Sequence, residues 1–154
     1  MWRRLRGAGA IYLQNSVAAL PATPAAERLL RGLRNEIVGE MSGTAQVLRA
    51  TALDGESEIV AAFNAARDDE YEEIVDRCKD FLAEIERNTK AEHFTYGELE
   101  ENDEDLNKLR NWHAKVVSRD AFSAGRAKDT EEALEACAKA LDGFAALVYE
   151  ADHG

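Results

Sequence analysis

Hydrophobic residues between positions 54 and 90 recur at alternating steps of three and four, with charged residues between them. This spacing places the hydrophobic residues on one stripe of a helix and turns most charged residues to water. The stripe consists of Tyr71, Ile74, Cys78, Phe81 and Ile85, and is continued upstream by Ile59, Val60, Phe63 and Ala66. Because no Pro or Gly occurs in this segment after Gly55, we expect a single helix over residues 54–90. At 1.5 Å per residue it is about 50 Å long and must bury its stripe against other helices.

Two more segments with the same kind of stripe follow. Residues 95–98 (Thr-Tyr-Gly-Glu) and 129–132 (Asp-Thr-Glu-Glu) have the spacing of capping boxes and predict where two helices begin. The stripes are Leu99, Leu106, Leu109, Trp112 and Val116 in the first helix, which runs to about Ser118, and Leu134, Cys137, Leu141, Phe144 and Val148 in the second. Gly143 would permit a close helix crossing. Three long helices with short connections predict an antiparallel bundle.

The first residues of the chain carry shorter elements. Residues 2–5 are predicted to be the last turns of a helix that Gly7 closes. Residues 10–14 and 17–20 have the composition of strands on either side of a turn at residues 15–16. They form either two strands or one bent strand.

A second helix of this region is predicted to begin at Pro24, with Thr23 as its N-cap, and to end at Gly39 or Met41. Its buried stripe would be Leu29, Leu30, Leu33, Ile37 and Met41. Residues 44–53 alternate after this helix and predict another strand. The residues expected to turn inward there are Ala45, Val47 and Leu53.

These elements predict an α+β protein in two parts: an αβ half-domain over residues 1–53, and a long-helix antiparallel bundle over residues 54–154 that packs on it or extends from it. No apolar run approaches the roughly 20 residues of a membrane span. The N-terminal arginines precede no hydrophobic core of a secretory signal. Cys78 and Cys137 match no metal or redox spacing. We therefore expect a reduced, cytoplasmic protein with no membrane partner.

Charge is distributed unevenly along the chain. The net charge is −11, yet residues 1–50 hold seven Arg and three Glu, and the remainder holds 12 basic and 27 acidic residues. The first fifty residues therefore carry +4 and the rest −15. Because an acidic helical body repels nucleic acid, an anionic partner such as DNA should meet the first fifty residues. The alternative is that these arginines only line solvated helix faces.

Several blocks of the sequence resemble one known family. Residues 9–17 are Gly-Ala-Ile-Tyr-Leu-Gln-Asn-Ser-Val, and residues 94–101 are Phe-Thr-Tyr-Gly-Glu-Leu-Glu-Glu. Further blocks are residues 2–6, 20–21, 63–68, 70–71, 105–112, 119–122 and 135–137. They fall in order over nearly the whole chain and resemble the N-terminal domain of ChrB, a family of bacterial chromate-resistance regulators. The resemblance implies transcriptional regulation through contact with DNA or with a protein.

The resemblance also implies that the α+β half is an incomplete ferredoxin-like fold. The first strand of the family, ahead of the tryptophan-containing helix, is absent here, as is the C-terminal chromate-associated domain. A weaker similarity, through residues 14–17, relates this half to the ferredoxin-like domains of Cas2 nucleases and PaaX-type repressors. The acidic residue that ends the first strand of those nucleases is missing, so nuclease activity is not expected. Unpaired sheet edges would favour a homodimer, unless the true start lies upstream of Met1.

Six arginines form the candidate binding site for DNA or an oxyanion. They are Arg3, Arg4 and Arg6 on the first helix and Arg28, Arg31 and Arg34 on the second. The two helices would present one basic face if they pack on the same side of the sheet. Guanidinium groups bind phosphate or chromate oxygens bidentately. Tyr12, Gln14 and Asn15 would add polar contacts.

No other group of residues favours catalysis or cofactor binding. Cys78 and Cys137 lie on core stripes and are expected to act as small hydrophobic residues, with redox or oxyanion sensing as the less favoured alternative. Glu150 and His153 have the spacing of one metal-binding pair, but a di-metal bundle needs two such pairs and two further Glu residues. We therefore predict a protein that is no enzyme and needs neither metal nor cofactor. Its partner is DNA, a second copy or another protein; the alternative function is a helical interaction module.

Overall fold

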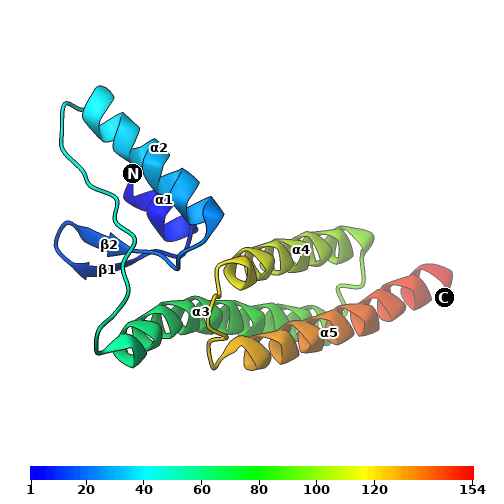
Figure 1. Cartoon of the computed structure of the whole chain (residues 1–154). Helices are drawn as coiled ribbons and strands as arrows, with labels where there is room; N and C mark the ends of the chain where they lie inside the picture. Colours follow the sequence, from blue (N-terminus) through cyan, green and yellow to red (C-terminus); the bar gives the residue numbers. More distant parts are fainter. The chain divides into compact units, whose positions relative to one another are not determined.

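The computed structural model describes residues 1–154 and is mostly helical, with one small antiparallel sheet (Figure 1). The elements in chain order are α1 (Trp2–Gly7), β1 (Ile11–Gln14), β2 (Val17–Ala19), α2 (Pro24–Gly39), α3 (Glu56–Lys90), α4 (Tyr96–Ser118) and α5 (Ala127–His153). The chain divides into two compact units. The N-terminal unit comprises Met1–Ala66 with Arg119–Phe122, and the bundle unit comprises Arg67–Ser118 with Ser123–Gly154.

In the N-terminal unit, β1 and β2 form a hairpin rather than one bent strand. They pair antiparallel, with Ile11 opposite Ala19 and Tyr12 opposite Ala18. Ser16 adopts a φ of 65° in the connecting turn, a conformation that reverses the chain within two residues. No further strand joins this two-stranded sheet, so the ferredoxin-like fold is not confirmed.

Helix α2 begins as predicted but ends before its last expected core residue. The Thr23 hydroxyl accepts a hydrogen bond from the Ala26 N–H at 3.0 Å, which satisfies a free donor of the first turn. Leu33 is buried, whereas Met41 is 62% exposed, so its assignment to the buried stripe was wrong. The helix stops at Gly39, and a left-handed Ser42 then turns the chain away.

Residues 44–53 do not form the predicted strand. They are extended without a backbone partner, and Val47 and Leu53 are exposed rather than turned inward. Side chains hold the segment instead: Arg34 Nε donates to the Ala45 carbonyl at 3.1 Å, and Arg49 pairs with Glu27. The alternating pattern failed here because alternation alone supplies no neighbouring strand to pair with.

In the bundle unit, α3 and α5 run parallel and α4 runs antiparallel to both. Thr130 Oγ1 lies 3.5 Å from the Tyr71 carbonyl oxygen. Seven residues further along each helix, Cys137 Sγ lies 3.6 Å from the Cys78 carbonyl oxygen. The rings of Tyr96, at the start of α4, and Tyr149, near the end of α5, are 5.7 Å apart. These contacts fix an up-down-up bundle.

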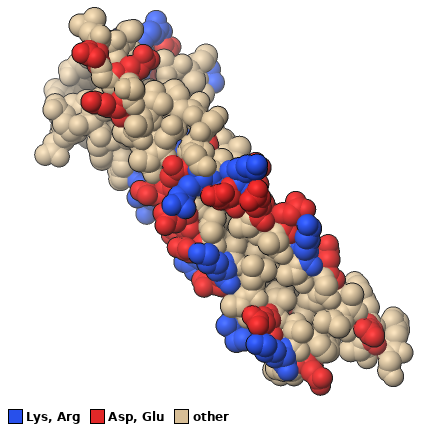
Figure 2. All heavy atoms as spheres, turned by 90° about the horizontal axis from the view of Figure 1, so that it is seen from below, with Lys and Arg blue, Asp and Glu red and all other residues tan.

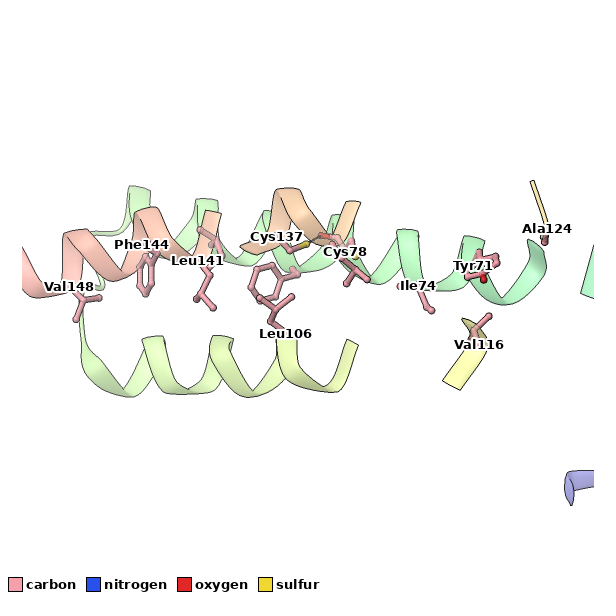
Figure 3. Packing of buried hydrophobic residues seen from close by; sticks show 13 residues of the cluster. Tyr71, Ile74, Cys78, Leu106, Val116, Ala124, Cys137, Leu141, Phe144 and Val148 are labelled. Atoms are coloured by element: carbon pink, nitrogen blue, oxygen red, sulfur yellow. Dashed lines mark hydrogen bonds between the residues drawn. The ribbon is translucent and has the colours of Figure 1, made fainter. Parts of the chain in front are cut away.

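The predicted stripes of the long helices form the core of this unit. Figure 3 shows residues of α3, α4 and α5 converging on the bundle axis. All five stripe residues of α3 and all five of α5 are buried. On α4, Leu106 and Val116 are buried, while Leu99, Leu109 and Trp112 are partly buried against the same cluster. The 3-4 spacing therefore predicted the bundle core correctly.

Two details of the bundle differ from expectation. Helix α5 begins at Ala127, and Thr130 is a fully buried helical residue rather than part of a capping box. The N-cap is Arg126, whose N–H donates to the Asp68 carboxylate at 2.9 Å. A carboxylate from another helix thus satisfies a donor of the first turn of α5, and sequence spacing cannot reveal that. Gly143 has no atom within 4 Å of where a Cβ would lie, so it allows no close crossing.

The capping box of α4 forms in part. The Glu98 N–H donates to Thr95 Oγ1 at 3.2 Å, as expected. The Glu98 carboxylate, however, accepts a hydrogen bond from the Asn88 side chain at 3.2 Å. It therefore links the start of α4 to the end of α3. None of the helices is both long and apolar enough to cross a membrane.

Candidate nucleic-acid interface

Arg28 and Arg31 lie on the outer side of α2. The inner side of this helix carries the buried Leu33 and the partly buried Leu29 and Leu30. Positions three apart on a helix are about 60° apart around its axis, so the two arginines project side by side. Both are exposed and neither forms an ion pair. Their guanidinium groups are free to meet a ligand.

Arg34 is held by the chain that follows α2. It donates from Nε to the Ala45 carbonyl. A carbonyl oxygen carries no net charge, so the positive charge of Arg34 stays uncompensated. Arg34 thus both ties Ala45 to α2 and adds to the positive charge of residues 1–50.

Arg4 is engaged in a structural ion pair. Its guanidinium binds the Glu36 carboxylate through both nitrogens, with Nη1 and Oε1 3.0 Å apart. This pair joins α1 to α2, which lie alongside each other (Figure 1). The hydrogen bond from Arg4 lowers the pKa of Glu36 below its ordinary value. Arg4 is therefore less available to a ligand than Arg3 and Arg6, which are exposed.

Arg49 pairs with Glu27 and was not singled out from the sequence. The Arg49 Nε lies 3.0 Å from Glu27 Oε1, and this hydrogen bond lowers the pKa of Glu27. The two residues are 22 positions apart, so no helical or strand spacing could have indicated the pair. The ion pair with Arg49 neutralises the charge of Glu27, an acidic side chain on α2.

The two ion pairs leave few unpaired charges among residues 1–50. Among residues 1–50, Arg3, Arg6, Arg28, Arg31 and Arg34 remain without a carboxylate partner, and only Glu40 among the glutamates is unpaired. Guanidinium groups without carboxylate partners suit phosphate or another oxyanion. The six-arginine site stays a prediction.

The polar residues of the hairpin are exposed beside α1. Tyr12 stacks on Trp2 with ring centroids 4.0 Å apart and an angle of 18° between the planes. Gln14 and Asn15 are exposed at the hairpin end. The stacking packs the Tyr12 ring against α1, although the residue as a whole is 54% exposed.

The comparison with protein families decides what kind of molecule this is. A family model described as "Protein ChrB, N-terminal" matches residues 1–154, the whole chain. The chain belongs to this family. The resemblance inferred from the sequence blocks is thus confirmed, and with it an association with chromate resistance. No curated protein and no solved structure matches the chain.

The bundle unit of this ChrB-family chain offers no comparable cationic site. In the view of Figure 2, its helices carry Asp and Glu side chains interspersed with Lys and Arg. This unit holds 23 acidic and 11 basic residues, and no group of three or more His, Cys, Asp or Glu side chains could hold a metal ion. An anionic ligand would therefore be repelled from this unit on average.

Proposed function

We propose that the chain is a bacterial, cytoplasmic regulator of chromate-resistance genes that contacts DNA through arginines of its N-terminal unit and catalyses no reaction. The match of the ChrB N-terminal family over the whole chain carries the proposal. The free guanidinium groups of Arg3, Arg6, Arg28 and Arg31, together with Arg34, support it. We further propose that the order α1, β1, β2, α2 corresponds to the middle of a ferredoxin-like fold.

The arginines explain affinity for DNA rather than recognition of sequence. Each guanidinium that neutralises a phosphate releases a counterion, so binding weakens steeply as salt rises. Contacts to phosphates fix position on the duplex but distinguish no bases. Sequence preference would then come from neighbouring polar groups such as Gln14 and Asn15, which are exposed at the hairpin end.

Capture of fragmented genomic DNA by the purified chain tests the proposal. We expect a few upstream regions to be enriched at low and moderate salt and to be released by chromate. An Arg28→Ala/Arg31→Ala variant should bind an enriched fragment at least about tenfold more weakly, and the slope of log affinity against log salt should fall by about two. Fluorescence anisotropy with a labelled fragment measures both quantities.

The matched control removes two arginines from the bundle unit. Arg77 and Arg110 are exposed there and form no ion pair, so Arg77→Ala/Arg110→Ala changes the net charge equally. Its affinity should stay within about twofold of wild type. If both variants lost affinity equally, the loss would come from net charge and not from Arg28 and Arg31. If the wild-type chain captured no DNA at either salt concentration, DNA binding would be rejected.

The hairpin supports a second candidate, an interaction module that pairs with a second copy. β1 and β2 each have one unpaired edge, and Tyr12, Leu13 and Val17 are exposed hydrophobic residues on them. Open edges of this kind favour pairing between chains. Light scattering should then show a dimer whose fraction rises with concentration and falls in Leu13→Lys. Leu48→Lys, at an exposed position outside the sheet, should leave the dimer intact; a strict monomer would reject this candidate.

A further inference from the structure

The two cysteines of the chain meet inside the bundle. Cys78 on α3 and Cys137 on α5 are 1% and 0% exposed, and both are free thiols. Figure 3 shows the two side chains directed toward each other from neighbouring helices. Cys137 Sγ lies 3.6 Å from the Cys78 carbonyl oxygen, so the thiol of α5 reaches the backbone of α3 at the level of Cys78.

The parallel register of α3 and α5 holds the cysteines at the same height. Thr130, fully buried one heptad before Cys137, contacts the carbonyl of Tyr71, one heptad before Cys78. Both pairs are separated by 59 residues in sequence. Two contacts at the same offset show that the helices keep one register over this heptad, which places the two cysteines at the same level.

Hydrophobic side chains surround the two thiols, so the group nearest to each thiol that can react with it is the other thiol. The side chains of the core cluster around them include Ile74, Phe81 and Leu141, and no third His, Cys, Asp or Glu completes a metal site. The Cys137 thiol, by hydrogen bonding, lowers the pKa of Cys78, whereas the Cys78 thiol and burial raise the pKa of Cys137. The two thiols therefore affect each other's ionisation, as sulfurs in contact should.

We propose that Cys78 and Cys137 are an oxidation site, in which a peroxide converts the opposed thiols into a disulfide that links α3 to α5. This inference does not depend on DNA binding. Partly buried alanines surround Cys137 on α5, at positions 133, 138 and 140. Hydrogen peroxide is little larger than water, so a brief parting of the helices admits it.

The reaction balances with the peroxide as the two-electron oxidant. In one of two equivalent orders, the Cys78 thiolate attacks one peroxide oxygen; an S–O bond forms, the O–O bond breaks and hydroxide leaves, giving a sulfenic acid. Cys137 sulfur then attacks Cys78 sulfur, so that the S–S bond forms and the S–O bond breaks. The leaving hydroxide takes up the Cys137 proton and departs as water, and the hydroxide from the first step takes up the proton released when the Cys78 thiolate formed, so two waters leave. One peroxide is consumed and the protein loses two hydrogens.

Alkylation of the whole chain after treatment with hydrogen peroxide tests the proposal. The treated protein is unfolded in a thiol-alkylating reagent, and the alkylated cysteines are counted by mass spectrometry. We expect two alkylated cysteines before treatment, none after it, and two again after dithiothreitol. The oxidised monomer should also melt several degrees higher, because the crosslink closes a long loop in the unfolded chain. Peptide mapping should recover residues 78 and 137 in one crosslinked species.

Single variants distinguish pairing from ordinary overoxidation. Cys78→Ala and Cys137→Ala each keep one thiol and should form no intramolecular crosslink. If wild type retains both alkylatable thiols until it unfolds, or yields only sulfinic and sulfonic acids, the proposal is wrong. Disulfide-linked dimers in place of the internal crosslink would also overturn it. Since these outcomes are read in wild type, a poorly folded variant does not decide the result.

Discussion

Phe144→Ala is expected to lower the free energy of unfolding by about 3–5 kcal/mol. Phe144 is 1% exposed on α5, and its ring lies 6.1 Å from that of Phe94. It contributes to the cluster in which all three long helices meet. Truncation removes the buried ring and leaves a cavity that three helices cannot close without shifting. Urea unfolding followed by circular dichroism measures the loss, with the slope of the transition checked for two-state behaviour.

Tyr149→Ala is the matched control for this prediction. Tyr149 lies on the same helix, is 51% exposed and packs edge-on against Tyr96. Its removal should cost about 1 kcal/mol or less, because most of the ring already contacts water and an aromatic pair contributes about 0.5–1.5 kcal/mol. Similar losses in the two variants would contradict the bundle packing described here.

Glu73→Pro is expected to destabilise the chain by about 3 kcal/mol or more. Residue 73 is an exposed position well inside α3. Proline there removes one backbone hydrogen bond and drives its ring into the preceding turn, so α3 must kink. A kink displaces the residues on either side of it from the core stripe, including Tyr71 and Ile74, which are buried. Urea unfolding measures the loss of stability. The helical circular dichroism signal at 222 nm should already be smaller than that of wild type in the folded protein, below the urea concentrations that unfold it.

Glu56→Pro provides the control at the start of the same helix. Glu56 is the first residue of α3, and the Gly55 carbonyl already accepts hydrogen bonds from the Glu58 and Ile59 N–H groups. The N–H at a first helical position has no partner within its helix, so proline costs little there. We expect a change within about 1 kcal/mol. A tolerated Glu73→Pro would show that α3 is not continuous.

The candidate binding site was only partly accessible to sequence reasoning. The six arginines could be found because they cluster on two predicted helices in a locally basic segment. The sequence could not show which of these arginines an acidic residue would neutralise, because Arg4 pairs with Glu36 across 32 residues of sequence. Arg49 and Glu27 meet across 22 residues. Such pairs depend on where helices pack, which no local pattern encodes.

The sequence by itself determined the long helices and their buried faces. Spacings of three and four residues select the same side of a helix whatever packs against it, so the stripes from Tyr71 to Ile85 and from Leu134 to Val148 followed from periodicity alone. The local hairpin and the Thr23 cap followed likewise, because their contacts lie within a few residues. The family could also be identified from short blocks in order along the chain.

Only the tertiary structure decided the remaining features, since each depends on contacts between distant residues. Residues 44–53 became an extended segment held by Arg34 and Arg49, because a strand needs a neighbour that alternation cannot supply. Helix α5 began early because Asp68 of another helix caps it. Cys78 and Cys137 looked like unrelated core residues until the parallel register of α3 and α5 brought them together.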